Sequence, residues 1–364
     1  MAMRRRSPRI AALLALLGVQ VTCFLQGLRQ TRPRQAAHDA QLVTFDFDAF
    51  SVPEEQQQGM ISSLARQMGV AEKLQVSHES VDEYLEQCLN AMPSNPYHGP
   101  AHIMDVMQFL HTLLRETGLD KQLSPVQTSA LVLAAAAHDV DHTGTSNALL
   151  VSLSHEFVED VEEGVGPMES HSGKRAVVLI QELLKCRDPV LLQSVQKAIH
   201  GTDLSQHDKI SKFFSAAIEA PSLDAFFQPG TDESTALLQM LLKASDVSNP
   251  ARPMRTAQAW NSQVYQEFYA EGDQVLSAGG MPNPLHDRRT NCIPKSSVGF
   301  INFHVKTIFL NLRNFLLRCH ELGMPVRPEG AEAVLARLDE NAAAFAQEAA
   351  KEEAKMEMQS MKRG

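Results

Sequence analysis

From about residue 55 onward, apolar residues recur three and four positions apart, and few stretches alternate between apolar and polar residues as a strand does. The clearest segments are residues 81–92, 101–117, 124–140, 172–186, 235–247 and 256–273. Residues 131–137 (LVLAAAA) are apolar on every side, which is typical of a helix in the middle of a bundle. The sequence therefore predicts an all-α fold, a compact bundle of many helices.

Proline and serine residues mark where several of these helices begin. Pro100 stands where a first helical residue would, Ser124-Pro125 opens the next segment, and Pro189 follows a break. Strong helix formers continue to the end of the chain. We expect one folded domain over residues 55–350, preceded by a linker at 39–54 and followed by a frayed helical tail at 351–364.

The composition predicts a hydrophobic core that needs no disulfides. Hydrophobic residues make up 44% of the 364 residues, enough for a sizeable interior. The cysteines are scattered and form no CxxC pair, which argues against a disulfide scaffold or a thiolate zinc site: Cys23, Cys88, Cys186, Cys292 and Cys319. This usage predicts a folded part of cytosolic type.

The net charge is unevenly distributed along the chain. Residues 1–38 carry seven arginines and no acid, so the rest of the chain carries −17 against a total of −10. A body this acidic repels a phosphate polymer, and we expect no nucleic-acid partner. A small phosphate substrate would need metal ions to receive it.

The first 38 residues are typical of a targeting or membrane-anchor segment. An apolar run at residues 10–25 lies between arginine-rich flanks, which suits a signal peptide, a short anchor in contact with a membrane, or an organelle presequence. The alternative is an extra amphipathic helix packed on the domain. The pattern does not decide the destination, and nothing in the sequence indicates the oligomeric state.

Histidines and aspartates gather at the predicted helix ends. His98 and His102 flank a helix start, His138-Asp139 ends the apolar helix, and Asp246 lies near the end of another. A lone buried histidine is usually a packing residue. An apolar helix that ends in adjacent His and Asp has buried two ionisable groups, and binding a cation offsets the cost of that burial.

The donor types narrow the chemistry. Imidazoles and carboxylates without thiolates suit zinc, iron or manganese, and additional oxygen ligands suit magnesium. Asp139 can bridge two ions, the arrangement used to activate water for attack on phosphorus. His98, outside the helix that carries His102, is placed to give a proton to a leaving group.

Six motifs, in this order and spacing, resemble the class I cyclic nucleotide phosphodiesterase catalytic domain, an HD-type metal-dependent phosphohydrolase. They are NPYHGPAH, AAAAHDVDHTGTSN, MESHS, HGTDLSQH, KASDVSNP and KSSVGFI, and the resemblance covers residues 80–345. It implies a 3′,5′-cyclic-nucleotide phosphodiesterase that hydrolyses cAMP, cGMP or both to the 5′-monophosphate. Two divalent ions are implied as cofactors, Zn2+ and Mg2+ or Mn2+.

The resemblance also implies roles for individual residues. His98 is the expected proton donor to O3′, and the expected metal ligands are His102, His138, Asp139 and Asp246. Expected to hold metal-bound waters or orient these ligands are His142, Glu169, His171 and Thr202. The expected nucleotide pocket comprises Tyr97, Asn249, Val264, Phe268, Ser297 and Phe300, with Phe300 stacking on the purine.

Four positions depart from the family pattern. Ser297 stands where the family has a purine-reading glutamine, and a serine is too short for that paired contact. Gly99 replaces an asparagine, Ser172 a histidine and Ala257 a tyrosine. None of these removes a metal ligand, so we expect hydrolysis with altered base recognition.

Other residues have a packing interpretation. Trp260, Tyr265 and the acids of residues 267–273 are interpreted as helix-packing residues, and His286 as a surface or packing residue. Two alternative functions stay open: a metal-containing pseudoenzyme that only binds nucleotide, and another HD-type metalloenzyme such as a nucleotidase or a di-iron oxygenase.

Overall fold

The computed structural model describes residues 42–361, and the secondary structure in that range is entirely helical. The all-α prediction is therefore confirmed. The chain divides into two units, residues 1–44 and 45–364, and the helices of the described range belong to the second. The predicted targeting segment and its apolar run lie outside the described residues. Within the described range, no helix has both the length and the apolar character that a membrane span requires.

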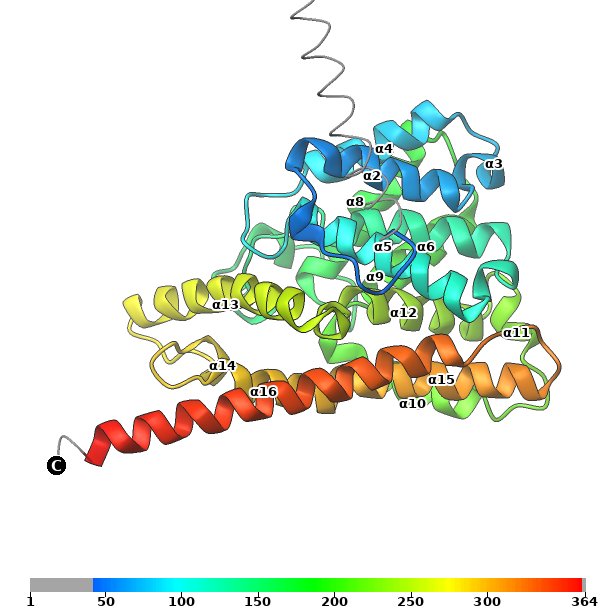
Figure 1. Cartoon of the computed structure of the whole chain (residues 1–364). Coiled ribbons are helices and arrows are strands. Elements are labelled where there is room, and N and C mark those ends of the chain that lie inside the picture. Colours follow the sequence, from blue (N-terminus) through cyan, green and yellow to red (C-terminus); the bar gives the residue numbers. More distant parts are fainter. Residues whose placement is uncertain (1–41, 362–364) are drawn as a thin grey trace, which may run out of the picture. The chain divides into compact units, whose positions relative to one another are not determined.

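The first half of the domain supplies the central helix and several of the helices packed around it (Figure 1). In chain order these elements are η1 (Ala49–Ser51), α2 (Glu54–Gln67), α3 (Val70–Leu74), α4 (His78–Asn90), α5 (Pro100–Thr117), η2 (Leu119–Lys121), α6 (Pro125–Ala137), α7 (Asn147–Ser152), η3 (Glu156–Val158), α8 (Pro167–Leu183) and α9 (Pro189–His200).

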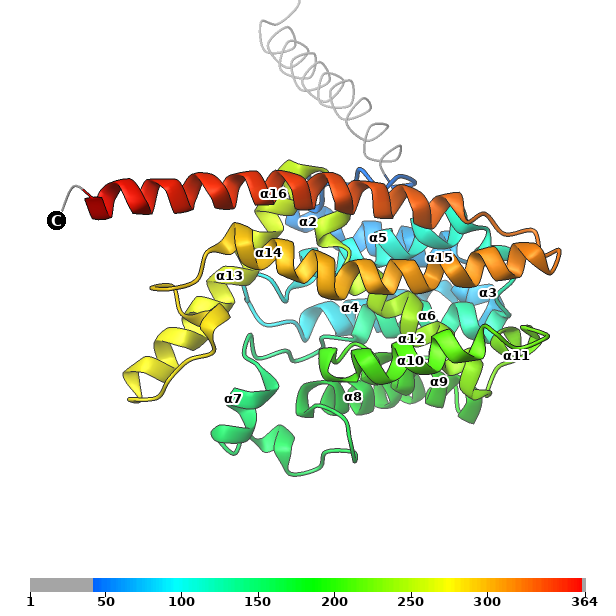
Figure 2. The ribbon, with the colours of Figure 1, turned by 90° about the horizontal axis from the view of Figure 1, so that it is seen from below.

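The second half closes the bundle and ends in its longest described helix (Figure 2). Its elements are η4 (Leu204–Gln206), α10 (His207–Ala217), α11 (Asp224–Phe227), α12 (Asp232–Asp246), η5 (Asn249–Ala251), α13 (Met254–Ser277), η6 (Pro284–His286), α14 (Ile293–Phe300), the π-helical turn η7 (Ile301–Val305), α15 (Lys306–Glu321) and α16 (Glu329–Met361).

The helix α6 lies at the centre because it has no polar face. Ser124 caps it, with Gln127 completing a reciprocal capping box, and Pro125 occupies the first turn. From Gln127 to Ala137 every residue is buried, as the apolar run predicts. The helix packs against α5, α8, α9 and α12, so its C-terminal end lies inside the bundle.

The packed body begins at Phe45, ten residues before the predicted domain boundary. The segment 45–52 fell within the expected linker, but its aromatic residues contact the body. The ring of Phe45 lies 5.1 Å from that of Phe109, Phe50 lies 4.5 Å from Trp260, and Phe47 is buried. The burial of Phe47 and the ring contacts of Phe45 and Phe50 fix this irregular segment against the body.

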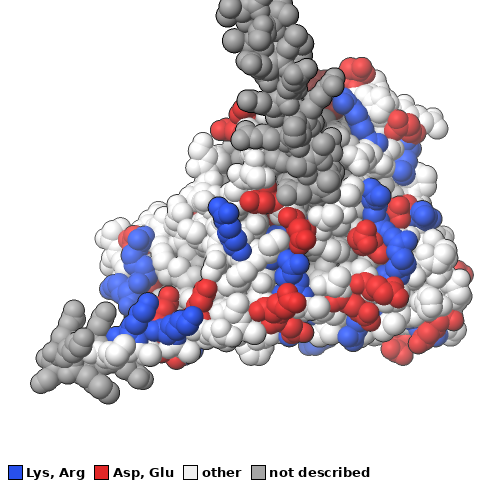
Figure 3. Space-filling view, viewed as in Figure 1, with Lys and Arg blue, Asp and Glu red and all other residues white. Residues whose placement is uncertain are grey.

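The helix α16 lies alongside α15 and α14 and continues through Met361 (Figures 1 and 2). Its buried positions end at Ala349, so the predicted tail region is helical and mostly exposed as far as its side chains are described. Acidic and basic side chains are interspersed on the face that carries α16 (Figure 3). The cysteines in the described range are free thiols: Cys88, Cys186, Cys292 and Cys319.

Candidate metal centre and active site

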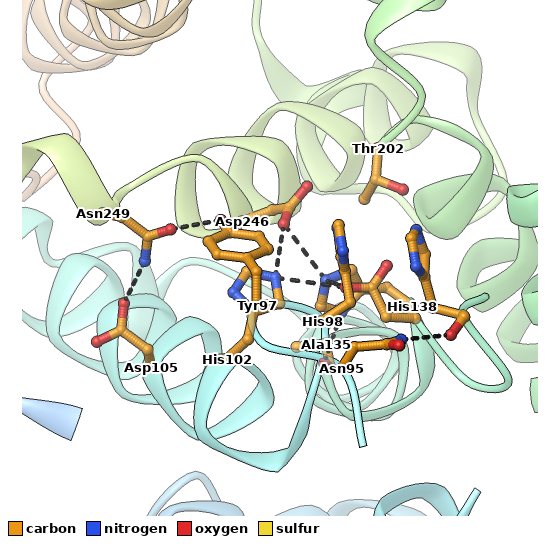
Figure 4. Close-up of polar contacts among 12 residues, drawn as sticks. Asn95, Tyr97, His98, His102, Asp105, Ala135, His138, Thr202, Asp246 and Asn249 are labelled. Carbon is orange, nitrogen blue, oxygen red and sulfur yellow. Dashed lines mark hydrogen bonds and ion pairs between the residues drawn. The ribbon is translucent and has the colours of Figure 1, made fainter. Parts of the chain in front are cut away.

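Four predicted metal ligands converge from the ends of three helices. His102 lies in the first turn of α5, His138 follows the last residue of α6 with Asp139 next to it, and Asp246 ends α12. One donor atom from each lies within 4.8 Å of the others. Figure 4 shows His102, His138 and Asp246 pointing toward one another. The sequence prediction that these residues meet is consistent with this geometry.

The distances between donor atoms are those of a tight cluster. Nε2 of His102 lies 3.1 Å from Oδ1 of Asp246 and 3.4 Å from Oδ2 of Asp139. Nε2 of His138 lies 3.1 Å from Oδ2 of Asp139 and 3.3 Å from Oδ1 of Asp246. Each imidazole therefore faces both carboxylates, and a cation placed among them would meet two nitrogens and two oxygens.

The protonation pattern of His138 favours a cation. Its Nδ1 lies 3.0 Å from the carbonyl oxygen of Ala135, which can only accept, so Nδ1 carries a proton and Nε2 is the nitrogen that would coordinate a cation once its own proton is displaced. Nε2 of His138 and Oδ2 of Asp139 are buried without a well-aligned hydrogen-bond partner in the described part of the chain. Buried polar atoms of this kind need an explanation, and a bound metal ion provides one. The residues therefore fit the metal that the sequence predicts.

The cluster also has a marked electrostatic signature. Burial by itself would lower the pKa of His102, but hydrogen bonds and attraction to Asp139 and Asp246 raise that pKa to about 9. The same imidazoles hold the pKa of Asp246 well below its ordinary value against the effect of burial. Without metal the cluster is thus a network of ion pairs, and a cation must displace protons from the histidines to bind.

His98 lies next to this cluster and is paired with Glu267 of α13. Nδ1 of His98 lies 2.5 Å from Oε2 of Glu267. The other carboxylate oxygen accepts hydrogen bonds from the backbone N–H groups of Tyr97 at 2.7 Å and His98 at 2.9 Å. The hydrogen bonds with His98 lower the pKa of Glu267 although burial opposes this. Glu267 thus fixes both the backbone and the ring of His98.

The interpretation of Glu267 as only a helix-packing residue was incomplete. Its position in the sequence, two turns after Trp260 on the same helical face, was the available signal. Trp260 itself contacts the site, with its ring 5.5 Å from that of Tyr97 and 6.0 Å from that of His102. A carboxylate on the helical face that carries this tryptophan is directed toward the same region.

His142 stacks on His98, with ring centroids 3.6 Å apart and planes 17° from parallel. His98, Asp139 and His142 form a second group of donors close enough to share a cation. Burial, with repulsion from His98, lowers the pKa of His142 to about 3, so its ring is neutral. Its Nδ1 accepts from the N–H of Gly144 at 3.0 Å, which leaves the proton on Nε2. A neutral donor of this kind suits the predicted role of holding water.

His171 contacts Asp141, which follows the predicted ligand Asp139 by two residues. Its Nε2 lies 2.9 Å from Oδ2 of Asp141, and its ring stacks on Phe157 at 3.7 Å. Asp141 has a positive φ of 62°, and its N–H donates to the carbonyl of Ala91. A residue keeps a strained backbone conformation only where its surroundings hold it there. The contacts of Asp141 with His171 and Ala91 therefore fix the turn that follows Asp139.

Glu169 and Thr202 have hydrogen bonds of their own. Oε2 of Glu169 accepts from Nδ2 of Asn147 at 2.8 Å, and burial, with repulsion from Asp203, raises its pKa to about 7. The hydroxyl of Thr202 donates to the carbonyl of Ile199 at 2.7 Å, so its oxygen retains lone pairs for another donor. The predicted roles of Glu169 and Thr202 toward metal-bound water stay predictions.

The predicted pocket residues fall into two groups. Asn249 and Tyr97 belong to the buried network beside His102: Asn249 donates to Oδ2 of Asp105 at 2.8 Å and accepts from the Tyr97 hydroxyl. Val264 is half-buried on α13, Phe268 stacks on His286 with centroids 4.5 Å apart, and Phe300 lies 5.7 Å from His304. Both ends of the Asn249 amide already have protein partners, which limits what it can offer to a nucleotide.

Ser297 is nearly buried, and its hydroxyl has two protein partners. It donates to the carbonyl of Ile293 at 2.8 Å and accepts from Nδ2 of Asn261 at 2.7 Å. Because the single hydroxyl proton is used on a carbonyl, the amide of Asn261 must be the donor, and its orientation is fixed. Asn261 was not among the predicted site residues. An amide is therefore present beside Ser297, but it comes from α13.

Several curated proteins are similar in sequence. The "Probable 3′,5′-cyclic-AMP phosphodiesterase pde-4" of Caenorhabditis elegans is 26% identical over 75% of this chain and 43% of its own length. The human "High affinity cAMP-specific and IBMX-insensitive 3′,5′-cyclic phosphodiesterase 8A" is 26% identical over 73% of this chain and 35% of its own length. The mouse "Dual specificity calcium/calmodulin-dependent 3′,5′-cyclic nucleotide phosphodiesterase 1C" is 30% identical over 59% and 30%. The match thus spans less than half the length of each relative.

Solved structures show the same fold. The structure of LmjPDEB1 in complex with IBMX superposes with a TM-score of 0.73 at 22% identity, covering 84% of this chain and 92% of that chain. The phosphodiesterase domain of the Salpingoeca rosetta rhodopsin phosphodiesterase gives a TM-score of 0.72 at 21% identity, covering 88% and 94%. The family model described as 3′5′-cyclic nucleotide phosphodiesterase matches residues 97–325, the region that carries all the predicted site residues, and the chain belongs to this family.

Proposed function

We propose that this chain hydrolyses a 3′,5′-cyclic nucleotide, cAMP, cGMP or both, to the 5′-monophosphate with the help of two divalent metal ions. The observation that carries the proposal is the convergence of His102, His138, Asp139 and Asp246 on one point, with the paired ring of His98 beside it. Membership of the phosphodiesterase family supports the same reaction.

The donor sets suggest which ions these are. Two imidazoles and two carboxylates without thiolates suit Zn2+ at the four-residue site. Asp139 belongs to both donor groups, so it would be the shared ligand, and a second site completed by waters suits Mg2+ or Mn2+. When bound, two such ions polarise a phosphoryl oxygen and lower the pKa of a coordinated water.

The protein supplies the proton that the leaving group needs. Oε2 of Glu267 holds the Nδ1 proton of His98, so Nε2 is the nitrogen that can pass a proton to the O3′ oxygen as its bond to phosphorus breaks. Two backbone hydrogen bonds to the same glutamate keep His98 in place during this step.

The direct test is hydrolysis by the purified chain. cAMP and cGMP are offered separately to metal-stripped protein, with Zn2+, Mg2+ or Mn2+ then added back. We expect release of the 5′-monophosphate from at least one nucleotide, loss of release on chelation and recovery on addition of metal.

An Asp246→Ala preparation, purified in the same way, controls for contaminating phosphodiesterases. Absence of product from either nucleotide with metal-loaded, folded protein would contradict the proposal and favour a nucleotide-binding pseudoenzyme. Bound iron together with oxygen consumption would instead indicate a di-iron oxygenase.

A further inference from the structure

A continuous chain of polar contacts, buried except for its half-buried end at Tyr97, leads from Arg252 to Tyr97 (Figure 4 shows its Asp105, Asn249 and Tyr97 members). Nη2 of Arg252 lies 3.0 Å from Oδ1 of Asp105, and both side chains are fully buried. Oδ2 of Asp105 accepts from Nδ2 of Asn249 at 2.8 Å. Oδ1 of Asn249 accepts from the hydroxyl of Tyr97. Four side chains from α5, η5 and the adjoining loops are thereby joined.

The donor and acceptor groups of these side chains allow only one orientation of the hydrogen bonds in this network. A guanidinium only donates and a carboxylate only accepts, so the Asn249 amide must turn its nitrogen to Asp105 and its oxygen to Tyr97. Turning the amide over would break both contacts at once. Burial raises the pKa of Asp105, and the charge of Arg252 offsets part of that rise. Through Asp105, the guanidinium of Arg252 thus determines that the Tyr97 hydroxyl meets the amide oxygen of Asn249.

The far end of the network touches the proposed reaction centre. The ring of Tyr97 lies 4.7 Å from that of His102 and meets the ring of His98 edge-on at 4.8 Å. A displacement of Tyr97 would therefore disturb both a metal ligand and the proton donor. A misplacement of about 1 Å can cost as much as a hundredfold in rate.

At the other end of the network, Arg252 has several contacts of its own. The guanidinium of Arg252 donates to the carbonyls of Asp105 at 3.0 Å and Phe45 at 3.2 Å, and it lies over the rings of Phe47 and Phe109. Burying a charge pair costs desolvation that its attraction barely repays, and apolar residues of similar size are often at least as stable. Stability alone therefore does not explain this pair, whereas orientation of Asn249 does.

We propose that Arg252 and Asp105 are positioning residues which, acting through Asn249, hold Tyr97 against His98 and His102. The effect on turnover rests on the proposed hydrolysis, but the positioning itself does not.

A double-mutant cycle tests the effect on turnover. Tyr97→Phe removes only the hydroxyl at one end, and Asp105→Asn removes the charge that Arg252 orients. We expect each to lower kcat tenfold to a hundredfold with little change in KM and with bound metal retained. The double variant should be no slower than the slower single variant, because both changes interrupt the same network.

The matched control is Tyr84→Phe. Its hydroxyl is also buried and donates to the carbonyl of Leu133 at 2.9 Å. We expect this variant to keep the wild-type kcat, and its effect should multiply with that of Asp105→Asn. Multiplicative losses for Tyr97→Phe with Asp105→Asn would overturn the proposal. If Asp105→Asn does not fold, Asn249→Leu interrupts the network at its middle with similar side-chain volume and takes its place in the cycle.

A second readout does not depend on activity. Trp260 is the single tryptophan of the chain, and its ring meets that of Tyr97 edge-on at 5.5 Å. Release of Tyr97 should change the emission maximum and acrylamide quenching of Trp260 in Tyr97→Phe, Asp105→Asn and Asn249→Leu, but not in Tyr84→Phe. Wild-type protein that hydrolyses neither nucleotide would refute the proposed function while this measurement still decides the positioning. Unchanged Trp260 fluorescence in all three network variants would overturn the inference.

Discussion

His98 has little conformational freedom in this structure, and that restriction suits the acid role that we propose for it. Glu267 holds its Nδ1 and its backbone N–H, and His142 covers one face of its ring. Gly99, which follows it, has an extended backbone and precedes the first residue of α5. The ring is thus fixed outside the helix while His102, four residues later, lies inside it. Two imidazoles close in sequence can therefore have different tasks.

The first prediction concerns His98 as the proposed proton donor. His98→Gln should lower turnover about 100-fold to 10,000-fold, the range that general acid catalysis supplies, while the bound metal content stays unchanged. Steady-state hydrolysis and elemental analysis of the same preparation measure both quantities.

The matched control for His98→Gln is His286→Gln. His286 is also paired with a glutamate of α13, with Nδ1 3.0 Å from Oε1 of Glu271, but we assign it no proton transfer. We expect this control to retain turnover within about threefold. Full activity of folded, metal-loaded His98→Gln would show that another group gives the proton.

The second prediction concerns metal retention. Asp246→Ala removes one of the four proposed ligands and leaves His102 and His138 facing a single carboxylate, so metal should be lost from the protein. Metal-to-protein ratios after dialysis measure the effect. Asp287→Ala is the control, because this carboxylate pairs with Arg289 on a loop. An unchanged ratio in Asp246→Ala would remove Asp246 from the ligand set.

At the scale of residues, the sequence predicts a site best where a motif directly follows a segment that is apolar enough to be buried. His138 and Asp139 follow an apolar helix, and that combination by itself indicates a bound cation. Glu267 and Asn261 give no comparable signal, since both lie in α13, where one polar residue resembles another. Their roles depend on which face meets the site, and that is decided by tertiary packing.

At the scale of elements, the pattern predicted the helices and several of their starts. Pro100, Pro125 and Pro189 each begin a helix as expected, because a missing N–H costs nothing in the first turn. The packing of residues 45–52 and the π-helical turn at Ile301–Val305 were not predicted. Both lack a periodic signal of their own and depend on contacts with other elements.

The third prediction concerns how the loop at residues 278–292 is held. A Cβ at Gly272 would lie 1.9 Å from the carbonyl oxygen of His286, so Gly272→Ala must push this loop away from α13. We expect a loss of unfolding free energy of about 1 to 3 kcal/mol, measured by urea denaturation.

A second glycine provides the control for Gly272→Ala. Gly59 lies within α2, and a Cβ there would meet no atom within 4 Å. Gly59→Ala should therefore raise the unfolding free energy by about 0.5 to 1 kcal/mol through helix propensity alone. The two glycine-to-alanine changes should therefore shift the unfolding free energy in opposite directions. Equal effects would mean that the loop does not pack on Gly272.

For the whole molecule, stability should depend on the metal and on pH together. A metal that binds only the folded chain adds about 2.7 kcal/mol when its concentration is 100 times its dissociation constant. That contribution would mask smaller electrostatic effects. The pH dependence intrinsic to the protein is therefore best seen with metal removed, when buried carboxyls such as Glu169 report on the folded state directly.

The fourth prediction is that ionisation of Glu169 lowers stability as pH rises. Burial and Asp203 raise its pKa from 4.5 to about 7, so between these values the folded chain retains a proton that the unfolded chain releases. Its contribution is fully present below pH 4.5 and is lost as pH rises through 7. Glu169→Gln removes this dependence, so the variant should gain about 2 to 3 kcal/mol relative to wild type between pH 4.5 and 8.

Urea unfolding of the chelated proteins across that pH range measures the difference, and Glu271→Gln gives the opposite case. Against the effect of burial, the hydrogen bonds of Glu271 with His286 and Ser146 lower its pKa, so its contribution is complete above about pH 4.5 and is lost only in more acidic solution. The gap between Glu271→Gln and wild type should therefore stay constant from pH 5 to 8. Parallel curves for Glu169→Gln and wild type would mean that Glu169 ionises in the folded protein as it does in the unfolded chain, and that burial and Asp203 do not raise its pKa.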